Sequence, residues 1–106
     1  MITIGELKKL EIRIGTILSA ERVENTDKLI KLEVDLGDEK RQIVTGIAEF
    51  FNVEDLEGKQ IPIASNLEPK TFKGIESQGM ILAVNVDGRP ILLHPEEEVP
   101  PGSSII

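Results

Sequence analysis

Hydrophobic and polar residues alternate along most of this chain with the period of two that is typical of β-strands. The pattern predicts strands over residues 11–23, 28–36, 41–47, 60–65, 80–86 and 90–94. The last two flank Asp87-Gly88, a dipeptide that strongly favours a hairpin turn. Leu32, Val34 and Leu36 would share one face of the second strand. In the first strand the shared face would hold Ile12, Ile14, Thr16, Leu18 and Ala20.

Two positions interrupt the pattern of the first strand. Ile17 is out of phase with the alternation, and Gly15 marks a place where the strand could bulge or curl. We therefore expect this strand to bend.

Two short helices are predicted beside the strands. Thr3 and Glu6 have the spacing of a capping box, and apolar residues follow at helical distance. Asn52 can cap a second helical stretch over residues 53–56, which Gly58 would end. About five strands with a small helix between the third and fourth favour an all-β fold with short helices. The oligonucleotide/oligosaccharide-binding (OB) barrel has this arrangement, although strand spacing fits a small sandwich or another barrel equally.

The connection over residues 66–80 carries the clearest local signals. Pro69 fixes its own φ and Gly74 permits a positive φ, so the segment should be a shaped turn and not a helix. Lys70 and Lys73 form a basic pair in a chain whose net charge is -7. An anionic ligand would explain a positive loop on an acidic protein. The alternative is a solvated hairpin loop whose lysines serve solubility.

Composition excludes several classes of function. A chain of 106 residues is expected to form one domain, residues 1–106. No apolar stretch approaches the length of a membrane span, and the start lacks the pattern of a signal peptide, so we expect a cytoplasmic location. There is no cysteine and one histidine, His94, which we expect at the surface. We therefore expect no metal site, no cofactor and no enzymatic activity.

Aromatic content and charge restrict nucleic-acid binding. The pI near 4.7 argues against a broad basic surface. The aromatic residues are Phe50, Phe51 and Phe72, and we expect the first two to pack into the core. Stacking on a row of single-stranded bases needs more platforms than this. Recognition of a folded RNA by shape and phosphate contact needs fewer.

Six segments, taken in order, resemble the tRNA-binding domain found at the C-terminus of many methionyl-tRNA synthetases. They are residues 11–15 (EIRIG), 25–29 (NTDKL), 41–47 (RQIVTGI), 56–59 (LEGK), 66–70 (NLEPK) and 73–80 (KGIESQGM). The same module occurs in the phenylalanyl-tRNA synthetase β-subunit, in a multisynthetase-complex cofactor, in free-standing tRNA-binding proteins and in CsaA-type export chaperones. The resemblance covers nearly the whole chain.

The resemblance implies a five-stranded OB barrel with N- and C-terminal extensions that grips tRNA with little sequence readout. The chain would be a free-standing tRNA-binding protein or a detached accessory, like a β-subunit, of a methionyl-tRNA synthetase catalytic subunit. Basic and small polar residues, with one apolar residue, are the candidates for contact with tRNA: Asn25, Lys28, Lys31, Arg41, Thr45, Lys59, Asn66, Lys70, Lys73, Ser77 and Met80. For each, a structural role is the alternative, and Met80 could simply be core.

Free-standing members of the family also dimerise. The candidates for a homodimer interface are apolar residues near the two ends of the chain: Ile2, Ile4, Leu7, Ile91, Leu93, Ile105 and Ile106. The alternative is that the ends close the barrel's own open end. Glu57, Glu68 and Glu76 would oppose phosphate near the groove, and residues 96–98, all glutamate, should face away from it.

A second function remains open at this stage. A CsaA-like chaperone would hold unfolded polypeptide, and the acidic pI favours that role. The NTDKL and VTG segments favour tRNA. The sequence does not predict which tRNAs would be bound.

Overall fold

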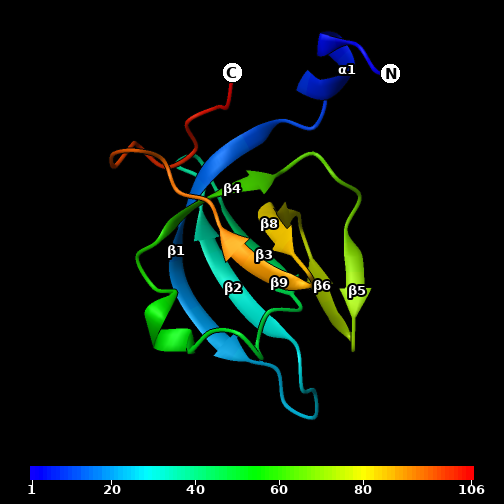
Figure 1. The fold of residues 1–106 in the computed structure, drawn as a ribbon, viewed down its shortest axis with the longest axis vertical. Coiled ribbons are helices and arrows are strands. Elements are labelled where there is room, and N and C mark those ends of the chain that lie inside the picture. The colour runs from blue at the N-terminus through cyan, green and yellow to red at the C-terminus, as the bar shows by residue number, and fades with distance from the viewer.

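In the computed structural model, which describes all of residues 1–106, short strands enclose one hydrophobic core (Figure 1). The two helices are α1 (Ile4–Lys8) and the 3₁₀ helix η1 (Val53–Asp55). The strands are β1 (Ile12–Arg22), β2 (Ile30–Asp35), β3 (Lys40–Thr45), β4 (Gln60–Ala64), β5 (Lys70–Phe72), β6 (Ile75–Ser77), β7 (Met80–Ile81), β8 (Ala83–Val86) and β9 (Arg89–Leu92).

Five strands form one antiparallel sheet in the order β3-β2-β1-β4-β7. The sheet curls until β7 approaches β3, so it is a nearly closed barrel, with η1 between β3 and β4 (Figure 1). This confirms the predicted all-β OB architecture. The hairpins β5–β6 and β8–β9 are separate two-stranded additions to the barrel.

The bend of β1 differs in place from the prediction. The register with β2 shifts between Ile17 and Ser19, so the bulge lies at Leu18 and not at Gly15. The shift turns Leu18 outward and Ile17 inward, and the predicted shared face of alternate residues is therefore wrong. Gly15 serves close packing instead, because a Cβ there would lie 2.3 Å from Val34 Cγ1.

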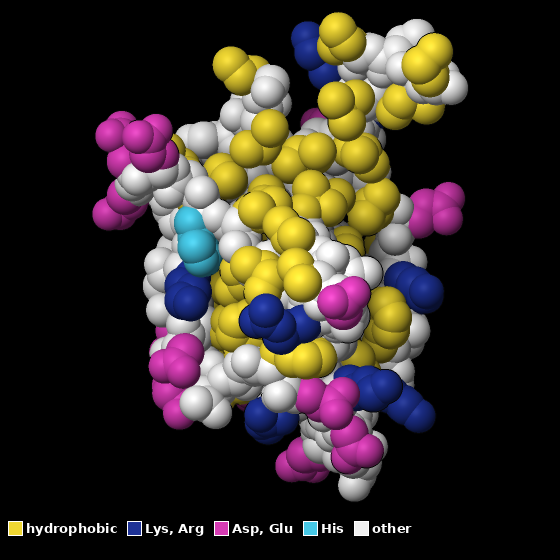
Figure 2. All heavy atoms as spheres, viewed as in Figure 1, with side chains coloured by type: hydrophobic (Ala, Val, Ile, Leu, Met, Phe, Trp, Pro, Cys, Tyr) yellow, Lys and Arg dark blue, Asp and Glu magenta, His cyan; other side chains and the backbone are white.

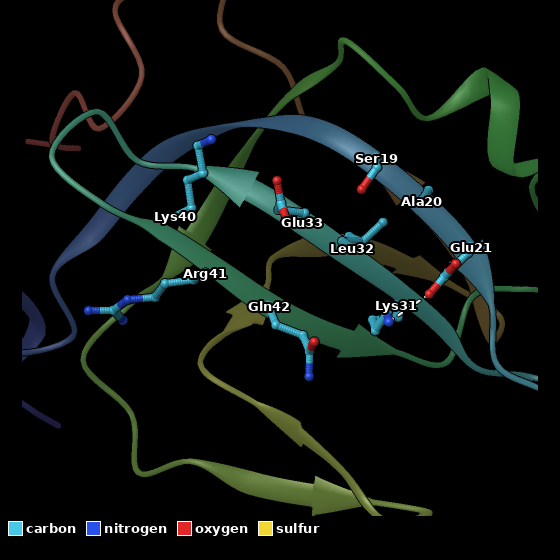
Figure 3. A pocket seen from close by; sticks show the side chains of 9 residues that line it. All are labelled: Ser19, Ala20, Glu21, Lys31, Leu32, Glu33, Lys40, Arg41 and Gln42. Atoms are coloured by element: carbon cyan, nitrogen blue, oxygen red, sulfur yellow. Dashed lines mark ion pairs between the residues drawn. The ribbon is translucent and has the colours of Figure 1, made fainter.

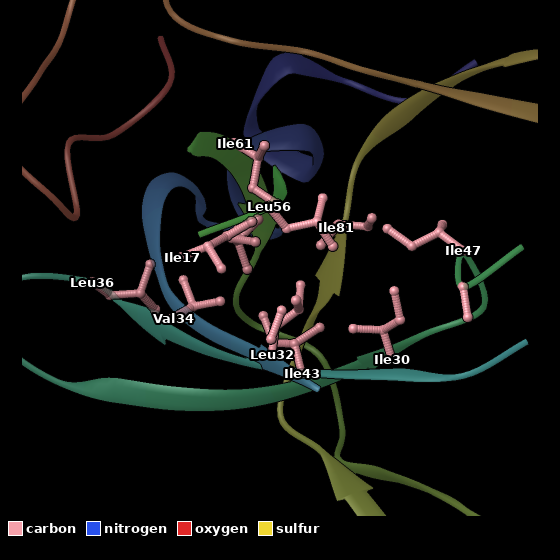
Figure 4. Close-up of a cluster of buried hydrophobic side chains, with 13 residues drawn as sticks. Ile17, Ile30, Leu32, Val34, Leu36, Ile43, Ile47, Leu56, Ile61 and Ile81 are labelled. Carbon is pink, nitrogen blue, oxygen red and sulfur yellow. The ribbon is translucent and has the colours of Figure 1, made fainter. Parts of the chain in front are cut away.

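The core consists of aliphatic side chains from every strand of the barrel. Figure 4 shows these side chains gathered in one cluster between the strands. Leu32, Val34 and Leu36 belong to it, so the predicted inward face of the second strand is confirmed. The ten fully buried side chains are Ile17, Ile30, Leu32, Val34, Leu36, Ile43, Val44, Leu56, Ile61 and Ile63. No aromatic ring is among them, so the barrel interior is filled by branched residues, which suit strands.

The two helices differ in how well their ends are capped. In α1 both bonds of the predicted capping box form: the Glu6 N–H donates to Thr3 Oγ1 at 3.1 Å and the Thr3 N–H to Glu6 Oε1 at 3.2 Å. Asn52 precedes η1 as predicted, but its side chain caps no backbone group. Neither helix has the length and the apolar run that a membrane-spanning helix needs.

The connection over residues 66–80 contains the hairpin β5–β6. Its two-residue turn is Lys73-Gly74, with φ of 51° and 81°, which are type I′ values. The turn expected from Gly74 is therefore confirmed. Asp87-Gly88 makes the predicted turn between β8 and β9 in the same way, with φ of 51° and 84°. The strand predicted over 80–86 is divided at Leu82 into β7 and β8.

Hydrogen bonds close the barrel between β3 and residues 77–78, at the end of β6. Ser77 Oγ accepts from the Val44 N–H at 2.9 Å and donates to the Gly79 carbonyl at 2.9 Å. Two further bonds join Gln78 to Gln42. The Gln78 N–H donates to the Gln42 carbonyl, and the Gln42 N–H donates to Gln78 Oε1. These groups replace a backbone ladder at the seam.

The C-terminal segment pairs with the first half of β1. Backbone bonds join Ile14 to Gly102 and Ser103, and Ile12 to Ile105. Arg13 reinforces this end by donating to the Leu36 carbonyl at 2.7 Å and to Asp38 Oδ1 at 2.6 Å.

Hydrogen bonding to arginine lowers the pKa of two carboxyls in the β2–β3 turn. Arg13 lowers the pKa of Asp38, and the Arg41 side chain, at 2.6 Å, lowers the pKa of Glu39.

We expect Ser77→Ala to lower the free energy of unfolding by about 1–3 kcal/mol, because the buried Val44 N–H loses its acceptor. Urea denaturation followed by far-UV circular dichroism measures this. Ser19→Ala is the matched control, since Ser19 is exposed on β1 and should change stability little. Equal stability of the two variants would show that the seam does not depend on Ser77.

Asp38→Asn should remove part of the acid sensitivity. A carboxyl whose pKa is lowered on folding stabilises the protein above its unfolded pKa, about 3.9, and loses that contribution as pH falls through the folded value. Urea midpoints of wild type and variant should therefore differ at pH 7 and converge as pH falls through the lowered folded-state pKa of Asp38. A difference that is unchanged at low pH would contradict this role, and Glu24→Gln, on an exposed carboxylate without an ion pair, is the control.

Candidate nucleic-acid interface

A hollow of about 570 Å³ lies between the β1–β2 loop, residues 23–29, and the β5–β6 hairpin. We call it the loop hollow. Its lining residues are Asn25, Thr26, Asp27, Lys28, Leu29, Thr71, Phe72 and Lys73. In OB barrels the corresponding loops, between the first and second and between the fourth and fifth barrel strands, hold oligonucleotides.

Local bonds fix the backbone on both sides of the loop hollow. Asn25 has a φ of 63°, which asparagine tolerates, and the Thr26 hydroxyl donates to the Val23 carbonyl at 2.8 Å. The Lys28 carbonyl accepts from the Ala48 N–H at 2.9 Å. Across the hollow, Lys73 has a φ of 51°, a position where asparagine or glycine is the usual choice. A lysine at this position therefore carries a backbone cost.

Free positive charge gathers at the loop hollow. Lys28 and Lys73 line it, and Lys70 lies on the same hairpin with its Nζ 5.1 Å from the centre of the Phe72 ring. None of the three lysines forms an ion pair. Asp27 is the one carboxylate in the lining. The arrangement suits a polyanion that contacts several lysines at once.

Two of the predicted basic residues are occupied elsewhere. Lys31 pairs with Glu21 at 2.6 Å across β1 and β2, and Figure 3 shows their side chains pointing toward one another. Arg41 donates to Glu39, to the Ser65 carbonyl and to the Gln78 carbonyl. Figure 3 shows its side chain extending past the edge of β3, although Arg41 also lines the hollow drawn there. Arg41 thus belongs to the seam of the barrel.

Most of the uncharged residues that were predicted to contact tRNA, apart from Asn25, are buried or hold the structure together. Thr45 and Ser77 are buried, and Met80 is partly buried against the core. Asn66 donates to the Lys9 carbonyl at 2.7 Å and so ties the loop after β4 to the end of α1. Lys59 lies in a different hollow, beside Phe50. Of the eleven predicted contact residues, the structure brings together Asn25, Lys28, Lys70 and Lys73.

The outer face of β1–β2–β3, drawn in Figure 3, is nearly neutral. Its lining sets Glu21 and Glu33 against Lys31, Lys40 and Arg41, a net charge of +1, and no aromatic side chain lines it. This face therefore lacks both the charge and the platforms that a single strand would use.

Two aromatic residues differ from the sequence prediction: Phe50 was expected in the core, and Phe72 was not among the predicted tRNA contacts. The expectation that Phe50 packs into the core is wrong, because the side chain is 46% exposed, whereas Phe51 does pack against the core. Phe72 lines the loop hollow. The hairpin signal at Lys73-Gly74 could have placed Phe72 beside the turn.

The glutamates lie largely apart from the loop hollow. Residues 96–98 line a separate hollow with Gln60 and His94, and His94 is exposed as expected. Glu76 is nearest to the hairpin turn, on β6 opposite Thr71.

A second surface of note is apolar. Figure 2 shows a continuous apolar area over the β8–β9 hairpin and toward the N-terminal end. We call it the apolar face. The exposed apolar residues of the β8–β9 hairpin are Val84, Val86 and Ile91, and those near the two ends of the chain are Ile2, Ile4, Leu7, Leu93, Ile105 and Ile106. All seven predicted interface residues are exposed, and no residue of α1 is buried.

Comparison with known proteins is consistent with this geometry. Residues 12–104 match a family model described as "Putative tRNA binding domain". The chain is 54% identical over 104 residues to a methionine–tRNA ligase of Archaeoglobus fulgidus and 46% identical to methionine–tRNA ligase 1 of Bacillus anthracis. Each alignment covers 98% of this chain and 16% of the ligase. The chain thus spans a small part of the length of these relatives.

Solved structures of similar length share the fold. A MetRS-related protein from Pyrococcus horikoshii has a TM-score of 0.94 at 42% identity, covering 100% of this chain and 98% of that one. The chaperone CsaA from Bacillus anthracis has a TM-score of 0.89 at 34% identity, covering 100% and 99%. The chain belongs to the tRNA-binding domain family.

Proposed function

We propose that this chain binds tRNA at the loop hollow, by its shape and phosphates and with little sequence readout. The observation that carries the proposal is that Lys28 and Lys73 line one hollow, with Lys70 on the same hairpin as Lys73, and that none of the three forms an ion pair in a chain with net charge -7. Membership of the tRNA-binding domain family supports it.

In this proposal the chain acts by binding and not by catalysis. It works either as a free-standing protein or as an accessory of a methionine–tRNA ligase. In both cases it raises the local concentration of tRNA at a synthetase. Relatives that are parts of methionine–tRNA ligases support the accessory role, and a neighbour of matching length supports the free-standing role.

Phosphate contact should dominate the affinity. Each lysine that meets a phosphate releases a condensed counterion, so the logarithm of the association constant should fall linearly with the logarithm of salt concentration. Asn25, Thr26 and Thr71 supply hydrogen-bonding groups beside the lysines and position the RNA backbone without reading bases. Modest affinity is expected, because Asp27 and Glu76 oppose phosphate nearby.

Lys73→Asn should weaken tRNA binding about fivefold at low salt while leaving the fold intact or more stable. The variant removes one phosphate contact, worth on the order of 1 kcal/mol at the surface, and gives the turn its preferred residue. Lys28→Gln should weaken binding similarly. Mobility shift with total tRNA at several salt concentrations should show the slope reduced by about one for each variant.

Two controls lie outside the loop hollow. Asp87→Asn places asparagine at the same position of the same kind of turn, on the β8–β9 hairpin, but removes a negative charge, so it controls for the backbone change and should not weaken binding. Lys8→Gln removes an exposed lysine from α1. Loss of affinity in the controls equal to that in Lys73→Asn would rule out the loop hollow as the site.

We further propose a homodimer built on the apolar face. The register of β8 with β9 places Val84 opposite Ile91, so their side chains share the outer side of the hairpin. At 43% and 36% exposure they leave apolar surface in water, and a two-fold contact would remove surface worth roughly 25 cal/mol per Å². The pairing of residues 102–105 with β1 covers that end of the barrel, yet Ile105 is 47% exposed.

Val84→Ser combined with Ile91→Ser should convert the dimer to a monomer at tens of micromolar protein. Multi-angle light scattering measures the mass directly. Leu18→Ser, at an exposed apolar position on β1 outside the apolar face, should stay dimeric. A wild-type chain that is monomeric at this concentration would refute the dimer.

A CsaA-like role in holding unfolded polypeptide is the second candidate. The observations that favour it are the similarity to CsaA and the extent of the apolar face. Separate binding assays with an unfolded protein and with tRNA distinguish the two functions. Binding of a reduced, unfolded protein that is lost in the Val84→Ser/Ile91→Ser variant, with no detectable binding of tRNA, would favour the chaperone.

A further inference from the structure

A second hollow combines an exposed aromatic ring with positive charge. It has a volume of about 280 Å³, and its walls come from the turn before η1, the start of β4 and the segment from β9 to His94. We call it the Phe50 hollow. The residues that line it include Phe50, Phe51, Lys59, Arg89, Ile91 and His94. It lies apart from the loop hollow, with which it shares no lining residue.

The backbone that carries Phe50 is rigidly held. Arg22 Nη2 donates to the Ala48 carbonyl at 2.8 Å and to the Phe51 carbonyl at 3.4 Å, and the Phe50 N–H donates to the Ile47 carbonyl at 3.0 Å. Phe51 packs against the core on the inner side. The exposed ring of Phe50 is therefore presented without a loop that must order on binding, which lowers the entropy cost of stacking.

The charged groups of the Phe50 hollow are all of one sign. Lys59 and Arg89 form no ion pair, and no carboxylate lines the hollow, although the chain has 19 acidic residues. His94 Nδ1 lies 2.8 Å from the Gln60 carbonyl oxygen, which can only accept, so Nδ1 carries a proton and Nε2 is left for another partner. An anion with a flat ring matches this set.

We propose that the Phe50 hollow binds one unpaired nucleotide of an RNA, with the base stacked on Phe50 and its phosphate between Lys59 and Arg89. The volume is below the roughly 300–1,000 Å³ of sites for drug-sized ligands, so it suits one base and not a row. Arginine and aromatic side chains are the groups that hold single-stranded bases and phosphates in other proteins.

The two hollows are mechanically connected. The Ala48 N–H donates to the Lys28 carbonyl, so the turn that carries Phe50 is bonded to the loop that carries Lys28. The inference takes from the proposed function only that the ligand is RNA, and it uses none of the lysines of the loop hollow.

The absence of tryptophan and tyrosine from the chain makes a direct test simple. The probe is a single-stranded RNA trinucleotide with 2-aminopurine at its centre, whose fluorescence is quenched by stacking and is free of protein background. Wild-type protein should quench it, and Phe50→Leu, which keeps an apolar side chain but removes the ring, should weaken binding at least about fivefold. Arg89→Gln should weaken binding and flatten its salt dependence.

Lys73→Asn separates this inference from the proposed function. It should leave trinucleotide binding unchanged while tRNA binding falls. Phe50→Leu should weaken trinucleotide binding. Absence of quenching by wild-type protein, or equal quenching by Phe50→Leu, would overturn the inference whatever tRNA does. Stronger binding of an acidic peptide than of the trinucleotide, with the same dependence on Phe50, would also overturn it and assign the hollow to a protein partner.

Discussion

The closing of the barrel by the Ser77 hydroxyl is the interaction on which the rest of the arrangement depends. β7 has only two residues, so backbone pairing alone cannot join it to β3. Ser77 and Gln78 supply the missing bonds, and in doing so they hold the β5–β6 hairpin against the barrel. Because the hairpin turn then lies beside the β1–β2 loop, the lysines of two distant segments meet at one hollow. The seam thus positions the candidate site.

The distribution of charge resolves the apparent conflict between an acidic chain and a polyanionic ligand. Net charge describes the whole molecule, whereas binding depends on the field at one place. Here three of the four arginines are used structurally: Arg13, Arg22 and Arg41 donate to backbone carbonyls that hold the barrel and its C-terminal segment together. Lysines without ion pairs remain at the hollows, and the glutamates of residues 96–98 lie elsewhere. A pI near 4.7 is therefore compatible with RNA binding.

The sequence predicted the fold better than the site, for a physical reason. Strand periodicity, the Thr3–Glu6 capping box and the two glycine turns are local signals, so they located most elements. The bulge at Leu18 was displaced from Gly15 because tight packing against Val34, a long-range contact, decides what Gly15 does. Ser77 falls on a family motif, and no local pattern says that its hydroxyl faces a strand 33 residues away. The exposure of Phe50 likewise depends on the tether from Arg22.

The two type I′ turns have the same backbone and opposite charge. Lys73-Gly74 and Asp87-Gly88 both require only a positive φ at two successive residues, and neither first residue packs against the core. The conformation of each turn is thus independent of the sign it presents. A barrel of this kind can change the charge at its rim by substitutions that leave every strand in place. Such freedom would let one scaffold acquire ligands of different chemistry over evolution.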